Sequence, residues 1–337
     1  VENADRKICE GDRLATTRFV SLHKRKTMNT LTKLGMMLLV MCVVVLSLNA
    51  VQEPPSDLTL EKKLVNDYNV YALPLPEYLE FAGERVPLED PDIRERMDRE
   101  LLVNTYWQSN GLLIFKRAHK YFPLIEPLLE KYGLPDDFKY LVVAESALQN
   151  NSSPAGASGF WHFMKATGRE YGLEINSYVD ERYNLELATK VAAEYLKNSK
   201  ERFGSWTMAA AAYNAGNGGI SKQIDRQGGV NDYYDLLLNE ETGRYIFRIL
   251  AFKEILSNPT KYGFNFREKD LYTPVPTYNV IVDTPVTDFA AFARKFDISY
   301  KVLKLHNPWL RETYLKNASG KEYVIQIPEK GYYSAGK

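Results

Sequence analysis

A succession of helical patterns between Asp90 and Ser257 constrains the fold of this chain more than any other feature. Asp90 and Pro91 have the form of an N-cap followed by proline at the first helical position. Apolar residues then recur at helical spacing, in segments separated by turn-forming residues. We therefore expect a mainly α domain over residues 90–257.

Prolines and capping residues mark the ends of the expected helices. A helix over 112–121 is followed by a helical stretch that Pro123 and Pro127 interrupt and that ends at Tyr132-Gly133. Asp136 is a candidate cap for the next helix, which reaches Glu145 near its C-terminal end. The remaining expected helices are Trp161–Gly168, Leu185–Phe203, Trp206–Ala215 and Glu241–Leu256.

After Asn258 and Pro259 the pattern of the sequence changes. Segments rich in β-branched residues alternate with helical ones in the order strand, helix, helix, strand. This order predicts a separate, small βααβ module over residues 277–330, joined to the helical domain by a linker over 258–276. The expected elements are Tyr278–Val282, Phe289–Phe296, Tyr300–Leu305 and Tyr323–Pro328.

An export signal precedes these domains. The basic residues 24–26 come before the uncharged apolar run Leu34–Leu48, and the small residue Ala50 follows, as is typical of a secretory signal peptide. We expect export to the cell envelope, the periplasm. Segment 28–50 would be a cleaved signal peptide or a retained membrane anchor, with lipidation of Cys42 as a third alternative. Residues 1–27 would be an upstream extension and residues 51–89 an extended strap.

Composition excludes several classes of function. Lys+Arg and Asp+Glu number 43 each, so no excess of positive charge exists to neutralise nucleic-acid phosphates. The cysteines, Cys9 and Cys42, lie in or before the leader, so the mature chain would have neither disulfides nor a Cys nucleophile. The 4 His show no metal-ligand spacing, and no phosphate-binding glycine loop occurs. We expect neither a metal nor a cofactor.

Glu145 is the catalytic candidate that the residues themselves indicate. It lies in the apolar segment Leu141–Ala147, near the expected C-terminus of a helix. Desolvation raises the pKa of a carboxyl group, and the negative end of the helix dipole raises it further. A Glu that stays protonated near neutral pH can act as a general acid. Taken alone, the local pattern still favours a Glu at the solvent edge of an amphipathic helix.

Four motifs taken together change that interpretation. They are Glu145-Ser146, the glycine-rich segment Gly156–Thr167, Ala211–Gly216 and Glu241–Ile246. In this order and at these spacings the chain resembles the catalytic domain of the soluble-lytic-transglycosylase superfamily, over roughly residues 90–256. The resemblance implies a lysozyme-like catalytic domain that binds peptidoglycan glycan strands.

The same resemblance implies the reaction. A lytic transglycosylase cleaves the bond between N-acetylmuramic acid and N-acetylglucosamine without water and leaves 1,6-anhydro-muramic acid ends. One carboxyl group in the groove is enough for this reaction, whereas ordinary glycoside hydrolysis needs two. The alternatives are a lysozyme-like muramidase, which hydrolyses the bond, and a non-catalytic peptidoglycan-binding protein.

Residues of the first two motifs receive roles from the resemblance. Glu145 would be the single catalytic acid/base, and Ser146 would help to orient the reacting groups. Gly156 and Gly159 would line the sugar-binding groove; otherwise they would be ordinary turn residues. His162 would bind substrate where these families usually have Gln. Neutral His offers a donor and an acceptor with a shorter reach, and protonated His offers only donors. This departure concerns sugar binding and not the acid/base step.

Three residues of the later motifs complete the expected site. Tyr213 and Asn214 would face Glu145 and the N-acetyl group of the sugar, and the hydroxyl of Tyr245 could bond to the Glu145 carboxyl. Outside the resemblance, both tyrosines would be core residues of apolar helices.

The C-terminal module loosely resembles LysM, which binds glycans that contain N-acetylglucosamine. Asp283-Thr284, Asn307-Pro308 and Ile325–Pro328 occur in the expected order, although Val282 and Pro285 stand where Gly and Leu are usual. The resemblance implies a LysM-like module that binds glycan; the alternative is a small packing domain.

Overall fold

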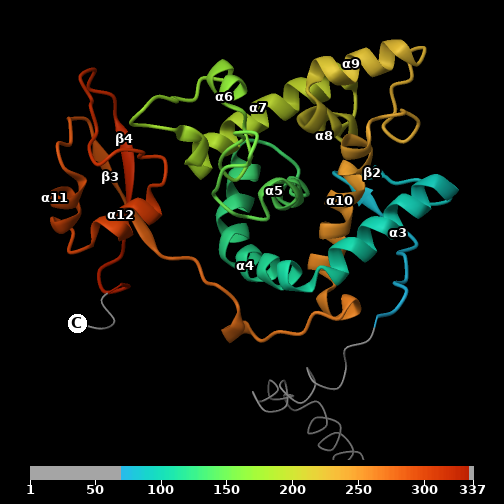
Figure 1. Ribbon diagram of the computed structural model, residues 1–337, viewed down its shortest axis with the longest axis horizontal. Coiled ribbons are helices and arrows are strands. Elements are labelled where there is room, and N and C mark those ends of the chain that lie inside the picture. Colours follow the sequence, from blue (N-terminus) through green and yellow to red (C-terminus); the bar gives the residue numbers. More distant parts are fainter. Residues whose placement is uncertain (1–69, 334–337) are drawn as a thin grey trace, which may run out of the picture. The chain divides into compact units, whose positions relative to one another are not determined.

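The computed structural model describes residues 70–333 (Figure 1). The expected upstream extension, the signal peptide or anchor, and the first part of the strap lie outside the described residues. Within the described range, no helix combines the length and the apolar character needed to cross a membrane. The rest of the strap contains a short antiparallel hairpin of β1 (Glu80–Phe81) and β2 (Glu84–Arg85). Its Phe81 is fully buried in the helical core.

The described part of the chain is mainly helical, as the sequence predicts. The helices of the first domain follow one another with short connections. They are α3 (Pro91–Tyr106), α4 (Gln108–Lys131), α5 (Phe138–Ser146), α6 (Lys165–Glu170), the 3-10 helix η1 (Glu181–Tyr183), α7 (Leu185–Phe203), α8 (Trp206–Ala215), α9 (Asn217–Arg226) and α10 (Glu240–Ser257).

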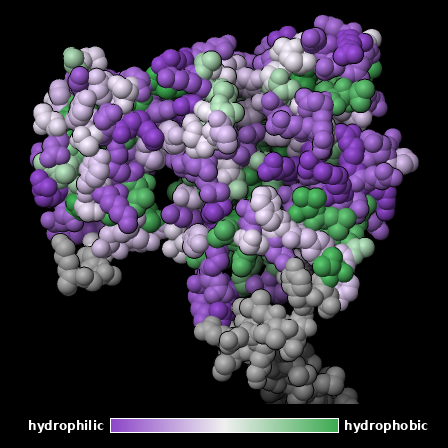
Figure 2. Space-filling view, viewed as in Figure 1, coloured by the Kyte–Doolittle hydropathy of each residue, from purple (hydrophilic) through white to green (hydrophobic). Residues whose placement is uncertain are grey.

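Helix α5 is enclosed by other helices, and this burial determines where Glu145 lies. Leu141, Val142 and Val143 have no exposed surface. Helix α10 packs against α3, α5 and α8, and α4 packs against α5 and α7, so that α5 lies in the middle of the group (Figure 1). Because the apolar helix faces point inward, hydrophilic residues dominate the surface in Figure 2.

Two expected helix boundaries are wrong because tertiary packing overrides the local signal. Helix α4 is one helix that continues through Pro123 and Pro127. Both prolines are exposed, so water can bond to the carbonyls that lose a helical N–H donor. The helix expected from Trp161 begins only at Lys165, because residues 159–162 form a turn around the fully buried Trp161.

Two further expectations about helix ends are also corrected. Asp136 does not cap α5; the N-cap is Asp137. The Asp137 carboxylate instead accepts hydrogen bonds from the Ala82 backbone and from Lys253 Nζ, each at 2.7 Å. Helix α9 was not expected, and the Gly-Gly pair at 218–219 lies inside its first turn.

The C-terminal module has the expected order of elements. Strand β3 (Thr277–Val282) is followed by α11 (Phe289–Arg294), α12 (Tyr300–His306) and β4 (Tyr323–Pro328). Strands β3 and β4 pair antiparallel along their whole length, with Thr277 opposite Pro328. The module core takes in Val179 from the helical domain, and the Asp180 backbone donates to the Trp309 carbonyl at 2.9 Å. The module therefore packs directly on the segment before α7.

The segment expected as a linker is partly structured. It contains the 3-10 helices η2 (Pro259–Tyr262) and η3 (Glu268–Asp270). Tyr262 and Phe264 are buried in the core of the helical domain. The first part of this segment therefore packs as an extension of α10.

Candidate active site

The C-terminal end of α5 brings Glu145 out of the helical core. The helix ends at Ser146, and the next two residues, Ala147 and Leu148, adopt left-handed backbone with φ of 49° and 56°. Left-handed backbone is unfavourable for residues with a side chain and persists only where the surroundings hold it. This tight turn leaves the Glu145 side chain 16% exposed, so the carboxyl group is accessible yet largely desolvated.

The environment of Glu145 favours its protonated form. Burial raises the pKa of this carboxyl to about 7, whereas the hydrogen bond from Tyr245 and the charge of Arg248 oppose that rise. The Tyr245 hydroxyl, from α10, donates to Oε1 of Glu145. The structure thus brings together the carboxyl and the tyrosine that the sequence motifs pair. A carboxyl with this pKa can give and take a proton near neutral pH.

The glycine-rich segment forms a tight turn whose backbone needs glycine at one position in particular. Gly159 has φ of 83°, and a Cβ placed on it would lie 1.8 Å from the backbone oxygen of Arg182. Its N–H donates to the Asn151 carbonyl at 2.9 Å. Gly156 has φ of 89° but faces open space. Gly159 therefore allows the turn to approach the segment before α7 closely.

A buried ion pair that the sequence did not indicate holds the same turn. The Arg182 guanidinium donates to both carboxylate oxygens of Asp180, at 2.9 and 2.7 Å. Its Nη1 donates to the backbone oxygens of Gly156 and Phe163, at 2.9 and 3.0 Å. Both side chains are about nine-tenths buried, at 8% and 11% exposed. No periodicity or motif marks these residues, because their partners come from a distant turn.

Replacing Arg182 with Met is expected to destabilise the fold by about 3 kcal/mol, because the buried Asp180 carboxylate and two backbone oxygens lose their donors. Urea unfolding followed by circular dichroism measures this loss. The double variant Asp180→Asn/Arg182→Met removes the unpaired charge and should recover part of the stability. A single variant that unfolds at the wild-type urea concentration would contradict this interpretation.

Three predicted site residues are engaged within the protein. The Tyr213 hydroxyl donates to the backbone oxygen of Trp161 at 2.7 Å, so it supports the glycine-rich turn. The Ser146 hydroxyl is buried and donates to the Val142 carbonyl of its own helix at 3.1 Å. The structure therefore does not bring Ser146 into the groove. Asn214 is turned towards the start of α10.

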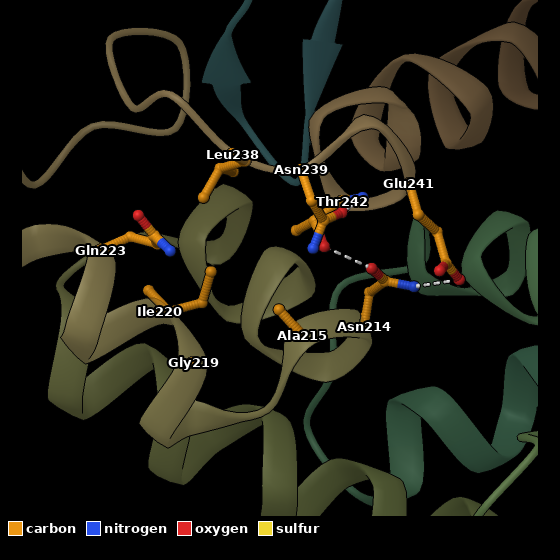
Figure 3. Close-up of a pocket in the computed structure, with 9 residues that line it drawn as sticks. All are labelled: Asn214, Ala215, Gly219, Ile220, Gln223, Leu238, Asn239, Glu241 and Thr242. Carbon is orange, nitrogen blue, oxygen red and sulfur yellow. Dashed lines mark hydrogen bonds between the residues drawn. The ribbon is translucent and has the colours of Figure 1, made fainter.

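Asn214 belongs to a pocket of about 310 Å³ between α8, α9 and the start of α10 (Figure 3). Its amide Nδ2 donates to Glu241 Oε1 at 3.3 Å, and its Oδ1 accepts from the Thr242 hydroxyl at 2.8 Å. Glu241 is a second carboxylate near Glu145, and its charge contributes to the raised pKa there. The sequence analysis gave Glu241 no role, although this residue begins one of the four motifs. Polar groups and the apolar Ile220 and Leu238 together line the pocket, as suits a sugar ring.

His162 lies beside Glu145, although the sequence had assigned it only to sugar binding. Its Nδ1 is 4.0 Å from Glu145 Oε2, and its Nε2 is 3.2 Å from Asn151 Oδ1. Burial lowers the pKa of this imidazole below its ordinary value. The backbone of His162 is left-handed, with φ of 48°. The turn therefore fixes the imidazole between Asn151 and the carboxyl.

A helical domain that presents a carboxyl of raised pKa at the end of a buried helix has the form of a lysozyme-like domain. Residues 124–236 match the family model of the transglycosylase SLT domain. Residues 278–331 match the soluble lytic transglycosylase C-terminal LysM-like domain. The chain therefore contains an SLT domain followed by a LysM-like domain, which confirms the resemblance that the motifs indicated. Glu145 lies inside the first match, and Tyr245 lies beyond it.

Curated relatives agree with these domains. The chain is 30% identical to membrane-bound lytic murein transglycosylase D from two strains of Escherichia coli, over 258 residues that make up 74% of this chain and 55% of each relative. A protein of an Alteromonas species, named for tributyltin chloride resistance, is 29% identical over 110 residues, 32% of this chain and 53% of its own. The chain thus spans about half the length of the curated relatives it matches.

Proposed function

We propose that this protein is a peptidoglycan lytic transglycosylase, a carbon–oxygen lyase that acts on a polysaccharide. It cleaves the bond between N-acetylmuramic acid and N-acetylglucosamine and leaves 1,6-anhydro-muramic acid ends. The observation that carries the proposal is the Glu145 carboxyl, which lies within an SLT domain, is largely buried, accepts a hydrogen bond from Tyr245 and has a pKa raised to about 7. The name of the Escherichia coli relatives supports the same reaction class.

Glu145 acts first as a general acid. Because Oε1 accepts the Tyr245 hydrogen bond, the proton of the neutral carboxyl lies on Oε2. This proton passes to the glycosidic oxygen while that oxygen takes the electron pair of its bond to the anomeric carbon of N-acetylmuramic acid. The acetamido group of the substrate can stabilise the positive charge that develops on this carbon. Glu145 is left as the carboxylate.

The carboxylate then acts as a general base. It takes the proton of the 6-hydroxyl on the same muramic acid residue, and the oxygen of that hydroxyl forms a bond to the anomeric carbon. Glu145 returns to its protonated form, and no water is consumed. An intramolecular nucleophile has a high effective concentration, so the protein need not position a water molecule.

Substrate binding is assigned to the residues around this carboxyl. The pocket beside Asn214 receives one sugar, with the carboxamide next to its N-acetyl group. The turn of Gly156 and Gly159, supported by Tyr213, lines the groove on the other side of Glu145. Ser146 acts only through the helix end that it stabilises. Residues 90–257 form the catalytic domain on this proposal.

The remaining assignments extend the proposal to the whole chain. The module over 277–330 binds N-acetylglucosamine-containing strands of the same polymer. Peptidoglycan lies outside the cytoplasmic membrane, so the protein acts in the cell envelope after export. Attachment to the membrane through residues 28–50 stays a prediction, because that segment lies outside the described residues.

Glu241 gives the hydrolase alternative a specific observation. It is a second carboxylate near Glu145 and is bonded only by the Asn214 amide among the hydrogen bonds of the described residues. A muramidase would need such a group as nucleophile or as base for a water molecule. Product chemistry separates the two reactions, because hydrolysis adds one water molecule for each bond cleaved.

The test is a digest of purified peptidoglycan with the products identified by mass spectrometry. We expect fragments that end in 1,6-anhydro-muramic acid and resist borohydride reduction. Fragments that carry the mass of one additional water and become reduced would identify a muramidase. Binding without soluble fragments would identify a non-catalytic wall-binding protein.

The pH dependence of cleavage should follow the protonation of Glu145. The acid form is required for the first step, so the rate should be lost as the pH rises through about 7. Initial rates of fragment release between pH 5 and pH 9, in buffers of constant ionic strength, measure this limb. A rate that increases steadily up to pH 9 would contradict a protonated Glu145 as the acid.

A further inference from the structure

The turn that carries His162 places a second ionisable group against the proposed acid. Nδ1 of the imidazole lies 4.0 Å from Oε2 of Glu145, and the two side chains are 15% and 16% exposed. This distance is beyond a hydrogen bond, so the imidazole acts on the carboxyl through its dipole or its charge. In a site so shielded from water, such an effect is weakened little by solvent or salt.

The partner on the other side of the ring determines the orientation of the imidazole dipole. Nε2 lies 3.2 Å from Asn151 Oδ1, which can only accept, so Nε2 must carry the hydrogen. In the neutral ring Nδ1 then carries no hydrogen, and this nitrogen is the one that lies 4.0 Å from Oε2 of Glu145. Asn151 is itself held, because its backbone oxygen accepts from the Gly159 N–H.

The neutral ring favours a proton on one particular oxygen of Glu145. Oε1 is occupied as an acceptor by the Tyr245 hydroxyl. The negative end of the imidazole dipole faces Oε2, so it disfavours negative charge there and favours the O–H form. Both neighbours thus direct the acid proton to Oε2. Protonation of His162 would remove this effect, because Nδ1 then carries a hydrogen and the ring carries a positive charge.

We propose that His162 is a positioning residue that keeps the acid proton on Oε2 of Glu145 while neutral and lowers the rate of cleavage when it becomes protonated. The inference rests on the proposed function and deepens it. It makes the site sensitive to acid in a way that the Gln usual at this position cannot, because Gln has no titrating group. The imidazolium would also oppose the positive charge that develops on the sugar.

Several other charged or titratable groups face Glu145. They come from two helices: Tyr213 from α8, and Tyr245, Arg248 and Glu241 from α10. Burial raises the pKa of both tyrosines well above 10, so neither hydroxyl loses its proton near neutral pH. Arginine keeps its charge throughout. Glu241 is therefore the group whose charge must be separated from that of His162.

The test compares the pH profiles of wild type and His162→Gln on purified peptidoglycan. Below the optimum the wild-type rate should fall by a factor that approaches about tenfold for each pH unit, as His162 becomes protonated. The rate of the variant should stay level over the same range, so the ratio of variant to wild type should rise as the pH falls. Titration of the substrate is common to both enzymes and cancels in this ratio.

A second variant protects the test against misfolding. Because His162 has left-handed backbone, His162→Asn suits the turn better than Gln and also lacks a titrating group. The matched controls are His119→Gln on α4, where the ring bonds to the Tyr272 backbone, and Glu241→Gln. Both controls should keep the acid limb of the wild type.

The outcomes separate this inference from the proposed function. If the wild type releases anhydro fragments and both His162 variants keep the wild-type acid limb, the role of His162 is refuted while the transglycosylase stands. Loss of the acid limb in Glu241→Gln would also refute it. If the wild type releases no anhydro fragments, the proposed function itself fails.

Discussion

Glu145→Gln is expected to reduce the cleavage of peptidoglycan by about 1,000-fold or more, because on the proposed mechanism it removes the group that both gives and takes the proton. The fold should be unaffected, since Gln keeps the size of the side chain and its Oε1 can still accept from Tyr245. Release of soluble fragments measures the loss, and circular dichroism checks the fold.

The matched control is Glu241→Gln, which changes the other carboxylate near the site. Glu241 lies at the edge of the pocket and accepts from Asn214, so its replacement should weaken cleavage far less than the loss of Glu145. If both variants are equally inactive and hydrolytic products occur in the wild type, two carboxyls carry the reaction. Glu145 would then be one member of a muramidase pair.

The same Glu145 variant should be more stable than the wild type at alkaline pH. Folding raises the pKa of this carboxyl from 4.5 to about 7, so the folded state binds the proton more tightly than the unfolded chain does. The wild type therefore loses stability as the pH rises from the lower value through the upper one. Gln does not titrate, so at pH 8.5 the variant should gain about 3 kcal/mol over the wild type, relative to any difference at pH 4.

Urea unfolding of both proteins at the two pH values measures this gain. An equal difference between variant and wild type at pH 4 and at pH 8.5 would mean that folding leaves the affinity of Glu145 for protons unchanged. That result would remove the physical basis for its role as an acid at neutral pH, whatever the activity of the variant.

Helices with strong caps could be predicted from the sequence to the residue. Helix α7 begins after Asn184, whose side chain accepts from the Leu187 N–H, and ends at Gly204 in left-handed backbone. Helix α8 begins after Ser205, which caps the Met208 N–H. Local side-chain chemistry fixes these ends. The turn at His162 is held by distant contacts, among them the Tyr213 hydroxyl on the Trp161 backbone oxygen, so local pattern could not place it.

The site shows the same division between local and distant information. Glu145 and Tyr245 could be paired from motifs, and the structure brings them into contact. The buried position of Ser146 could not be predicted, because it depends on how α5 packs. Arg182 was missed, because its structural role depends on hydrogen bonds to the backbone oxygens of Gly156 and Phe163, which lie far from it in the sequence.

Gly159→Ala is the second substitution with a large expected effect, a loss of about 4 kcal/mol in folding stability. The methyl group would overlap the Arg182 backbone oxygen at 1.8 Å, and the φ of 83° is itself unfavourable for alanine. Neither chain can move aside easily, because the Arg182 guanidinium ties the two segments together. Activity should also fall, because a displaced turn would change the distance between His162 and Glu145.

Gly156→Ala is the matched control for this argument. It lies in the same glycine-rich segment with a similar φ of 89°, but a Cβ there meets nothing within 4 Å. The loss of folding stability in Gly156→Ala should come from the left-handed backbone alone, about 1 kcal/mol. Urea unfolding of the two variants separates the overlap from the conformational term. Equal losses would mean that the turn can shift away from Arg182, and the close approach would then not be what positions His162 beside the acid.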